Sequence, residues 1–252
     1  MDRILFFCLL CVQTLHAQDK KIKLEQYFAV LRENRQFNGN VLVVDAGMTI
    51  YERSFGYSDF VHKDLNTRHT IFPIASLSKT ITATAILQLA QSGKINIDDP
   101  AVRYLTEFPY PEITIKNLLS HTSGLPPYNA YFDSLRKHQP ERVFSNADFM
   151  NGLVTNKKPL VYQPGEKGNY DNINFIVLAL LLEKVSGMTY AEYIQKYILR
   201  PAGMTNTVFF VSPSISLSLF RQPGKSQCSS VYKKLLAHLQ FYWVRGLCKY
   251  NA

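Results

Sequence analysis

Residues 71–90 read IFPIASLSKTITATAILQLA, and the rest of the chain is organised around this stretch. It places Ser76 and Lys79 three residues apart at the start of a long apolar segment, so a helix would carry both side chains on one face. A serine hydroxyl is a weak nucleophile until a base removes its proton, and an amine one helical turn away can be that base. Free N–H groups at a helix start suit a developing oxyanion. The stretch therefore predicts an activated serine.

The Ser-x-x-Lys spacing needs support from its surroundings, because about one match is expected by chance in a chain of this length. Two further copies occur, at residues 134–137 and 230–233. Only the copy that begins at Ser76 follows an apolar approach and opens a run rich in Ala, Ile and Leu with almost no charge, as a buried helix does. The other two lie among basic and polar residues, which is typical of a solvated surface.

A second candidate group, Tyr170 and Asn172, follows the Pro164-Gly165 turn and precedes a strongly apolar segment. Alternate side chains of an extended chain share a face, so the phenol and the amide can point the same way. Tyr170 would pass a proton between Ser76 and a leaving group if nearby positive charge lowers its pKa. The alternative is a turn tyrosine that packs on its own helix.

The segments around these groups predict a helix and a hairpin followed by a mostly helical region. Apolar spacing predicts a helix over Ile22–Arg35, and β-rich runs at Asn40–Val44 and Thr49–Phe55 predict a hairpin. Phe175–Val185 should be a buried helix that ends at Gly187. Helix caps are predicted at the following positions: Thr114, Ser145 and Thr189.

The N-terminus predicts export. Residues 1–17 have a charged start, an apolar stretch and a small residue at Ala17, as a cleaved secretory signal does, and an N-terminal membrane anchor is the alternative. Elsewhere the sequence offers no stretch with the length and apolarity of a membrane span. We therefore expect a periplasmic or extracellular protein.

The charge distribution and the cysteines limit the kinds of partner that we expect the protein to bind. The net charge is +9, and residues 211–252 carry six basic and no acidic residues, so the excess is concentrated in the tail. With no nucleic-acid-binding motif and with export expected, a nucleic-acid partner is not predicted. Removing the signal leaves Cys228 and Cys248, whose pairing the sequence does not decide, and no metal-ligand spacing accompanies them.

Several segments together resemble one superfamily. FPIASLSKTITATAILQLAQSGKINIDDP, ITIKNLLSHTSGLPPY, GNYDNINFIVLALLLEKVSGMTYAEYI and ILRPAGMTNT occur in the order typical of serine β-lactamases and penicillin-binding-protein-like enzymes. The chain is most similar to the branch of class C β-lactamases, D-alanyl-D-alanine carboxypeptidases and esterases. The resemblance implies an α/β (α+β) fold of the β-lactamase/transpeptidase type, with a helical lobe and an antiparallel sheet.

The resemblance also implies roles for the candidate residues. Ser76 would be the acylated nucleophile, Lys79 its general base or proton relay, and Tyr170 the partner in proton transfer. Asn172 would bind substrate or orient Lys79. The Ser76 N–H would form half of the oxyanion hole, water would complete hydrolysis, and neither a metal nor an organic cofactor is implied.

For two other polar residues the sequence gives only a weak indication of a catalytic role. His121, in the HTSGLPPY segment, is interpreted as a turn histidine that stabilises its loop rather than as a triad base. Glu166 is interpreted as an exposed residue of the Pro-Gly turn rather than as a second base for water. A Gly-x-Ser-x-Gly elbow is absent from the sequence, which disfavours an α/β-hydrolase.

The chain departs from the superfamily pattern after about residue 210. The third motif of the family, Lys-Thr/Ser-Gly or His-x-Gly on a strand beside the site, is not found, and Val244-Arg245-Gly246 is the nearest candidate. We expect a signal peptide at 1–17, a partial β-lactamase-related domain at 18–210 with an incomplete sheet, and an atypical basic tail at 211–252. A truncated or frame-shifted member and a divergent C-terminal lobe both fit this pattern.

The sequence thus favours an exported serine hydrolase that forms an acyl-enzyme on a β-lactam, a D-alanyl peptide or an ester. The partner would be a small-molecule or peptide substrate, such as a fragment of peptidoglycan. The alternatives are an inactive relative that binds cell-wall peptide, and a membrane-surface protein that acts through its basic tail. The substrate among the three classes and the oligomeric state are not readable from the sequence.

Overall fold

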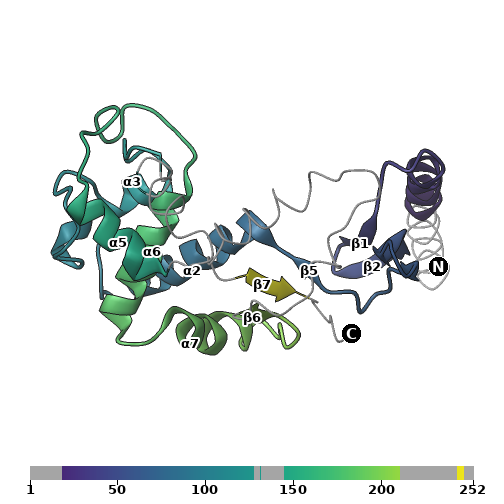
Figure 1. Cartoon of the computed structure of the whole chain (residues 1–252). Helices are drawn as coiled ribbons and strands as arrows, with labels where there is room; N and C mark the ends of the chain where they lie inside the picture. The colour runs from purple at the N-terminus through teal and green to yellow at the C-terminus, as the bar shows by residue number, and fades with distance from the viewer. Residues whose placement is uncertain (1–18, 128–130, 132–144, 211–242, 247–252) are drawn as a thin grey trace, which may run out of the picture. The chain divides into compact units, whose positions relative to one another are not determined.

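The computed structural model describes residues 19–127, 131, 145–210 and 243–246, which fall into two compact units (Figure 1). The described part of the first unit is 19–70, and the remaining described residues form the second. The predicted signal peptide and most of the predicted basic tail lie outside the described residues, so the predicted division of the chain stays a prediction.

The first unit is built on the predicted hairpin. Its strands are β1 (Gly39–Asp45), β2 (Met48–Phe55), β3 (Tyr57–Asp59) and β4 (Asp64–Leu65). β1 and β2 pair antiparallel, as do β3 and β4. Ala46 and Gly47 join β1 to β2 with φ values of 48° and 80°, the left-handed conformation that a two-residue type I′ turn requires. The hairpin prediction is confirmed.

A helix over residues 19–33 covers one face of this hairpin, close to the range predicted from the apolar spacing. The ring of Phe28 stacks on Tyr51 and on Phe55, with 5.6 Å between ring centroids in each case. Aromatic contacts of this kind add to the stabilisation that burial itself provides. Phe28 thereby fixes the N-terminal helix to β2.

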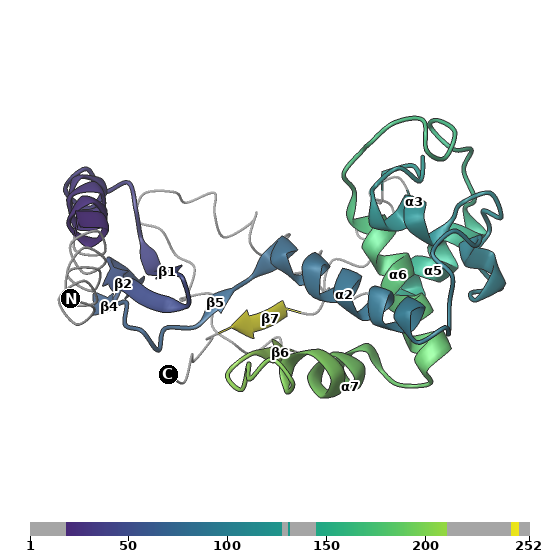
Figure 2. The same cartoon turned by 180° about the vertical axis from the view of Figure 1, so that it is seen from behind.

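The second unit is mostly helical and contains the segment around Ser76 (Figures 1 and 2). Its helices and helical turns are η1 (Ala75–Leu77), α2 (Ser78–Gln91), η2 (Ala101–Arg103), α3 (Ile115–Leu119), α5 (Asn146–Thr155), α6 (Asn172–Ser186), α7 (Tyr190–Ile194) and η3 (Gln195–Leu199). Its strands are β5 (Phe72–Pro73), β6 (Val208–Phe210) and β7 (Trp243–Gly246). Helix α6 contacts α2, α3, α5 and α7, so it is the central helix of this unit.

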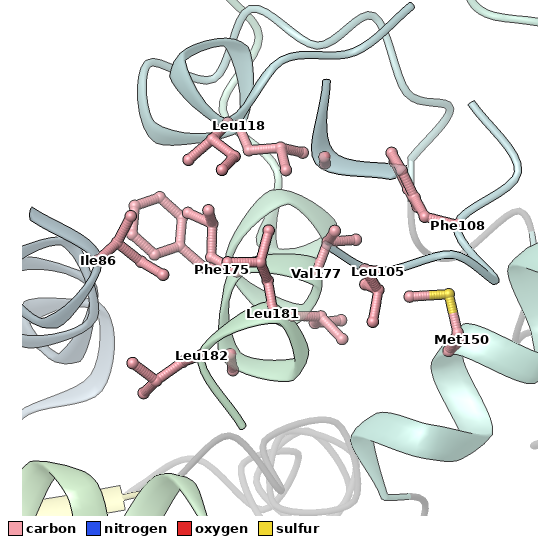
Figure 3. Packing of buried hydrophobic residues seen from close by; sticks show 14 of the residues in the cluster. Ile86, Leu105, Phe108, Leu118, Met150, Phe175, Val177, Leu181 and Leu182 are labelled. Carbon is pink, nitrogen blue, oxygen red and sulfur yellow. The ribbon is translucent and has the colours of Figure 1, made fainter. Parts of the chain in front are cut away.

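The hydrophobic core of the second unit surrounds α6 because this helix is apolar on all sides (Figure 3). Phe175 of α6 faces Ile86 of α2, while Leu118 of α3 lies above them in the same view. Fully burying each side chain of this kind is worth about 1.5–3 kcal/mol. The buried helix predicted from the sequence is therefore confirmed, and it anchors the loop that enters it.

The predicted helix ends are also confirmed. Thr114, Ser145 and Thr189 cap α3, α5 and α7, and each forms a reciprocal capping box with the residue three positions later. Gly187 follows the last residue of α6 with φ 68°, the left-handed conformation in which a glycine ends a helix without strain. Gly187 thus fixes where α6 ends, and the three caps fix where α3, α5 and α7 begin.

Three short strands form an antiparallel sheet in the order β5-β7-β6. The backbone of Arg245 in β7 pairs with Pro73 of β5 on one side and with Val208 of β6 on the other. Together with the hairpin and the helices, this confirms the expected α+β class with small antiparallel sheets. Within the described ranges no single helix has the length and apolarity to cross a membrane; α6 passes such a test only jointly with Tyr190–Leu199, across a 79° bend.

Candidate active site

Ser76 is held in a short helical turn between a strand and a long helix. β5 ends at Pro73, η1 carries Ser76, and α2 begins at Ser78. Ala75 has φ 43°, a left-handed conformation that costs a residue with a side chain roughly 1–2 kcal/mol, so the backbone is strained directly before Ser76. The Ser78 hydroxyl donates a hydrogen bond to the Ala75 carbonyl at 2.7 Å and supports this turn. The turn presents the Ser76 side chain on the surface.

Lys79 lies on the first turn of α2 and contacts two of the other candidate residues. Its Nζ is 3.2 Å from Ser76 Oγ and 2.7 Å from Asn172 Oδ1, and it donates a hydrogen bond to each. The side chain is half-buried. The predicted i, i+3 placement on one helical face is confirmed, and the amine is within proton-transfer distance of the serine oxygen.

Tyr170 contacts the same serine oxygen. Its hydroxyl donates a hydrogen bond to Ser76 Oγ at 2.7 Å, and Lys79 Nζ lies 5.0 Å from the centre of its ring. Partial burial by itself raises the pKa of the phenol. Hydrogen bonding with Lys79 and with Ser76, together with the Lys79 charge, outweighs that effect, and the pKa of Tyr170 lies below its usual value of 10. A lowered Tyr170 pKa is the condition under which this phenol was expected to transfer a proton.

Asp171 explains why Tyr170 and Asn172 share a face. It is the extended N-cap of α6, with φ −145° and ψ 144°, and its side chain accepts a hydrogen bond from the Ile173 N–H. Tyr170 and Asn172 flank it and therefore point the same way. The sequence analysis placed Asn172 on extended chain before the apolar helix. This prediction is wrong, because Asp171 is the cap and Asn172 is the first residue of α6.

Two loops far apart in the sequence are joined beside Tyr170. The carbonyls of His121, Thr122 and Gly124 accept hydrogen bonds from the N–H groups of residues 169, 165 and 161, each at 2.8 Å. Gly124 has φ 74°, and a Cβ there would lie 2.1 Å from the carbonyl oxygen of Tyr162, so only glycine fits. These contacts hold the chain that leads to Tyr170 in one position.

The rings of His121 and Phe175 line this site, and the sequence did not assign them to it. The ring centre of His121 lies 4.5 Å from that of Tyr170 and 5.1 Å from that of Phe175. Lys79 Nζ is 5.9 Å from the centre of the Phe175 ring. The i, i+3 spacing of Asn172 and Phe175 on one helix was the available signal for Phe175.

Glu166 belongs to its own turn, as predicted: its carboxylate accepts a hydrogen bond from the Gln163 N–H at 3.1 Å and pairs with Lys167 at 3.4 Å. Cys228, Cys248 and the other two Ser-x-x-Lys copies lie outside the described residues. Among the residues that the structure describes, His, Cys, Asp and Glu form no group of three or more that could hold a metal ion.

Comparison with solved structures defines the class of fold. The fold matches that of a penicillin-binding protein from Bacillus halodurans, with a TM-score of 0.65 and 31% identity over 75% of this chain and 58% of the other. A class C β-lactamase in complex with cefoxitin matches with a TM-score of 0.62 and 25% identity, over 78% of this chain and 52% of the other. The chain therefore has a β-lactamase/penicillin-binding-protein-like fold.

Sequence comparison then gives the family. Residues 24–222 match the family model described as Beta-lactamase, and the chain belongs to this family of serine hydrolases. Penicillin-binding protein 4* of Bacillus subtilis (strain 168) is 37% identical over 190 residues, which are 75% of this chain and 42% of that protein. The chain thus spans less than half the length of this relative.

Proposed function

We propose that the protein is an exported serine hydrolase that forms an acyl-enzyme through Ser76 on an amide or ester. The observation that carries this proposal is that Ser76 Oγ lies within hydrogen-bond distance of both Lys79 Nζ and the Tyr170 hydroxyl. A serine between two groups that exchange protons is the arrangement nucleophilic catalysis needs. The family match supports hydrolase chemistry.

In the proposed reaction the Ser76 proton moves first. Lys79 as a free amine, or Tyr170 as a phenolate, takes the proton from Ser76 Oγ while the oxygen attacks the substrate carbonyl. The lowered pKa of Tyr170 favours its part in this transfer. When the tetrahedral intermediate collapses, the carbon–nitrogen or carbon–oxygen bond breaks, and the leaving group takes up the proton. Water then attacks the ester on Ser76, its proton returns to Ser76 Oγ, and the acid product leaves.

Asn172 is proposed to orient Lys79. Its Oδ1 accepts a hydrogen bond from Lys79 Nζ at 2.7 Å, so one N–H group of Lys79 is already bound. This contact restricts the rotation of a long side chain and keeps the amine beside Ser76. Asn172 would in addition present its NH₂ group to a substrate carbonyl.

A β-lactam is the first substrate class to test. The relatives cited above are penicillin-binding proteins, and one matching structure holds cefoxitin. A strained cyclic amide acylates a serine and leaves the ring-opened product attached, so the adduct has the mass of protein plus drug. D-alanyl peptides and simple esters use the same acyl chemistry and differ in the pocket that they need.

The experiment is a time course of intact mass with a β-lactam and, separately, a fluorophosphonate. The expected result is one adduct on the wild type, none on Ser76→Ala, and an unchanged adduct on Ser92→Ala. Ser92 is the matched control because it lies at the opposite end of α2 and its hydroxyl bonds only to the nearby Leu89 carbonyl among the contacts described. An adduct of equal yield on Ser76→Ala would overturn the proposal.

One observation favours a second candidate, a relative that binds cell-wall peptide without turning it over. The third motif of the superfamily is not found in the sequence, and loss of one oxyanion donor costs roughly 10² to 10³ in rate. This candidate predicts saturable binding of a D-alanyl peptide that is the same in the wild type and in Ser76→Ala, with no mass adduct on either.

A further inference from the structure

The imidazole of His121 faces two hydrogen-bond donors through a single nitrogen. Its Nδ1 lies 3.4 Å from the backbone nitrogen of Asp171 and 3.2 Å from Nδ2 of Asn174. The Asn174 amide is oriented by the buried Ser123 hydroxyl, which donates to Asn174 Oδ1 at 2.6 Å, so the NH₂ group must face the histidine. Nδ1 is therefore an acceptor, and the proton of the neutral ring is on Nε2.

The same ring supports the phenol of Tyr170. The two ring centres are 4.5 Å apart, and the His121 carbonyl accepts a hydrogen bond from the Asn169 N–H at 2.8 Å. His121 thus contacts the residue before Tyr170 through its backbone, Tyr170 through its ring, and Asp171 through Nδ1. All three contacts fix the short segment that carries the phenol.

The surroundings of the ring favour its neutral form. The charged or titratable groups that face it are Lys79 on α2 and Tyr170 and Asp171 at the start of α6. Burial lowers the pKa of His121 below 6.5, the Lys79 charge lowers it further, and the Asp171 carboxylate raises it by less. A proton on Nδ1 would place a donor against the two donors that it now accepts from.

We propose that neutral His121 is a positioning residue, which holds Tyr170 against Ser76 through the Nδ1 acceptor and the ring contact. This inference rests on the proposed function, because the benefit of a fixed Tyr170 is acylation of Ser76. It gives His121 a role that its interpretation as a loop-stabilising turn residue did not include. Protonation of His121 in mildly acidic solution would release Asp171 and with it the phenol.

Two variants of His121 separate the acceptor from the ring, and a third variant is the control. His121→Phe keeps a ring and removes the acceptor; His121→Asn places an acceptor oxygen near the position of Nδ1, suits the φ of 58°, and cannot be protonated in this range. His69→Phe is the matched control, since His69 is exposed in the first unit. Melting curves check that each variant is folded.

The acylation rate is measured against pH with a fluorophosphonate. His121→Phe is expected to lower the rate about 100-fold, the effect of a displacement of about 1 Å at a reacting group. His121→Asn should restore most of that rate and remove one ionisation from the acid limb of the profile, while His69→Phe leaves rate and profile unchanged.

In a Tyr170→Phe background, His121→Phe should have no further effect. Equal loss with and without the Tyr170 hydroxyl would overturn the proposal.

A readout that needs no activity keeps the proposal separate from the proposed function. In ¹⁵N-histidine NMR, His121 is expected to show an unprotonated Nδ1 and a protonated Nε2, with a pKa below 6.5. In ¹³C-tyrosine NMR, His121→Phe is expected to move the pKa of Tyr170 up toward 10, because the phenol leaves Lys79 and Ser76. A protonated Nδ1, or a Tyr170 pKa that His121→Phe does not change, would contradict the proposal even in a protein that no probe acylates.

Discussion

At the scale of single residues, the candidate site is a set of short polar contacts on a strained turn. Ser76 follows a left-handed alanine, and its oxygen is shared by an amine and a phenol. The site uses side chains from a turn, from the first turn of α2 and from the start of α6, so their distances depend on how these elements pack. Small shifts of Tyr170 would change its distance to Ser76 and therefore the rate of proton transfer.

Removal of one oxygen atom tests the role of Tyr170. Tyr170→Phe should lower the acylation rate by about 10² to 10⁴, the usual contribution of a general acid or base. It should leave the melting temperature nearly unchanged, because 59% of the residue's surface is exposed. Stopped-flow labelling with a fluorophosphonate measures the rate. Tyr27→Phe removes the same atom from a residue that is 60% exposed and should have no effect; an equal loss in both variants would exclude a specific role.

At the scale of elements, α6 and the loops that enter it position the site. The contacts of residues 121–124 with 161–169 direct the chain to Tyr170, and the Asp171 cap sets where α6 begins. On the other side, Thr82 of α2 is hydrogen-bonded to Tyr190 of α7 at 2.6 Å in the buried core. The helix that carries Lys79 is thus fixed by a polar contact as well as by apolar packing.

Gly124→Ala tests the contact between the two loops. A Cβ would meet the Tyr162 carbonyl at 2.1 Å, so the loops must separate, and both stability and acylation rate should fall. Gly93→Ala is a matched control, because it has a similar φ of 71° but no atom within 4 Å of the added Cβ. Its cost is limited to backbone strain of roughly 1–2 kcal/mol. Urea denaturation and labelling rates of both variants make the comparison, and an equal effect of the two would contradict the account.

Thr82→Val tests the polar contact between α2 and α7. Loss of the hydroxyl removes this hydrogen bond from the buried Tyr190, and the free energy of unfolding should fall by about 1–3 kcal/mol. Thr84→Val makes the same change at an exposed position on α2, where the hydroxyl bonds only to the Thr80 carbonyl among the contacts described. Chemical denaturation should show a loss for Thr82→Val well above that for Thr84→Val. No difference between them would show that the contact does not stabilise the packing.

At the scale of the whole molecule, the sequence predicts those structural features that depend on residues close together along the chain. The hairpin, the caps of three helices and the buried helix were readable because turn residues, caps and apolar periodicity act locally. The meeting of Ser76 with Tyr170, 94 positions away, followed from the resemblance and not from spacing. The contacts of His121 with Asp171 and Asn174 were not predictable, because they depend on the packing of two distant loops and α3 against α6.

The chain belongs to the β-lactamase family over residues 24–222 and spans only part of the relatives that it matches. The geometry around Ser76 is nevertheless contained in the second unit. β7 lies beside β5, which leads into the turn of Ser76, so the nearest candidate for the third motif, Val244-Arg245-Gly246, is on a strand next to the one that enters the site. Whether Ser76 reacts can therefore be measured on this chain itself.

The most direct measurement is to locate the label on the protein. After reaction with a fluorophosphonate, the protein is digested and the modified peptide is sequenced by tandem mass spectrometry. We predict one label, on Ser76, and none on Ser134 or Ser230, which begin the other two Ser-x-x-Lys copies. A folded protein that carries the label on either of those serines, or carries none, would contradict the claim that Lys79 and Tyr170 activate Ser76.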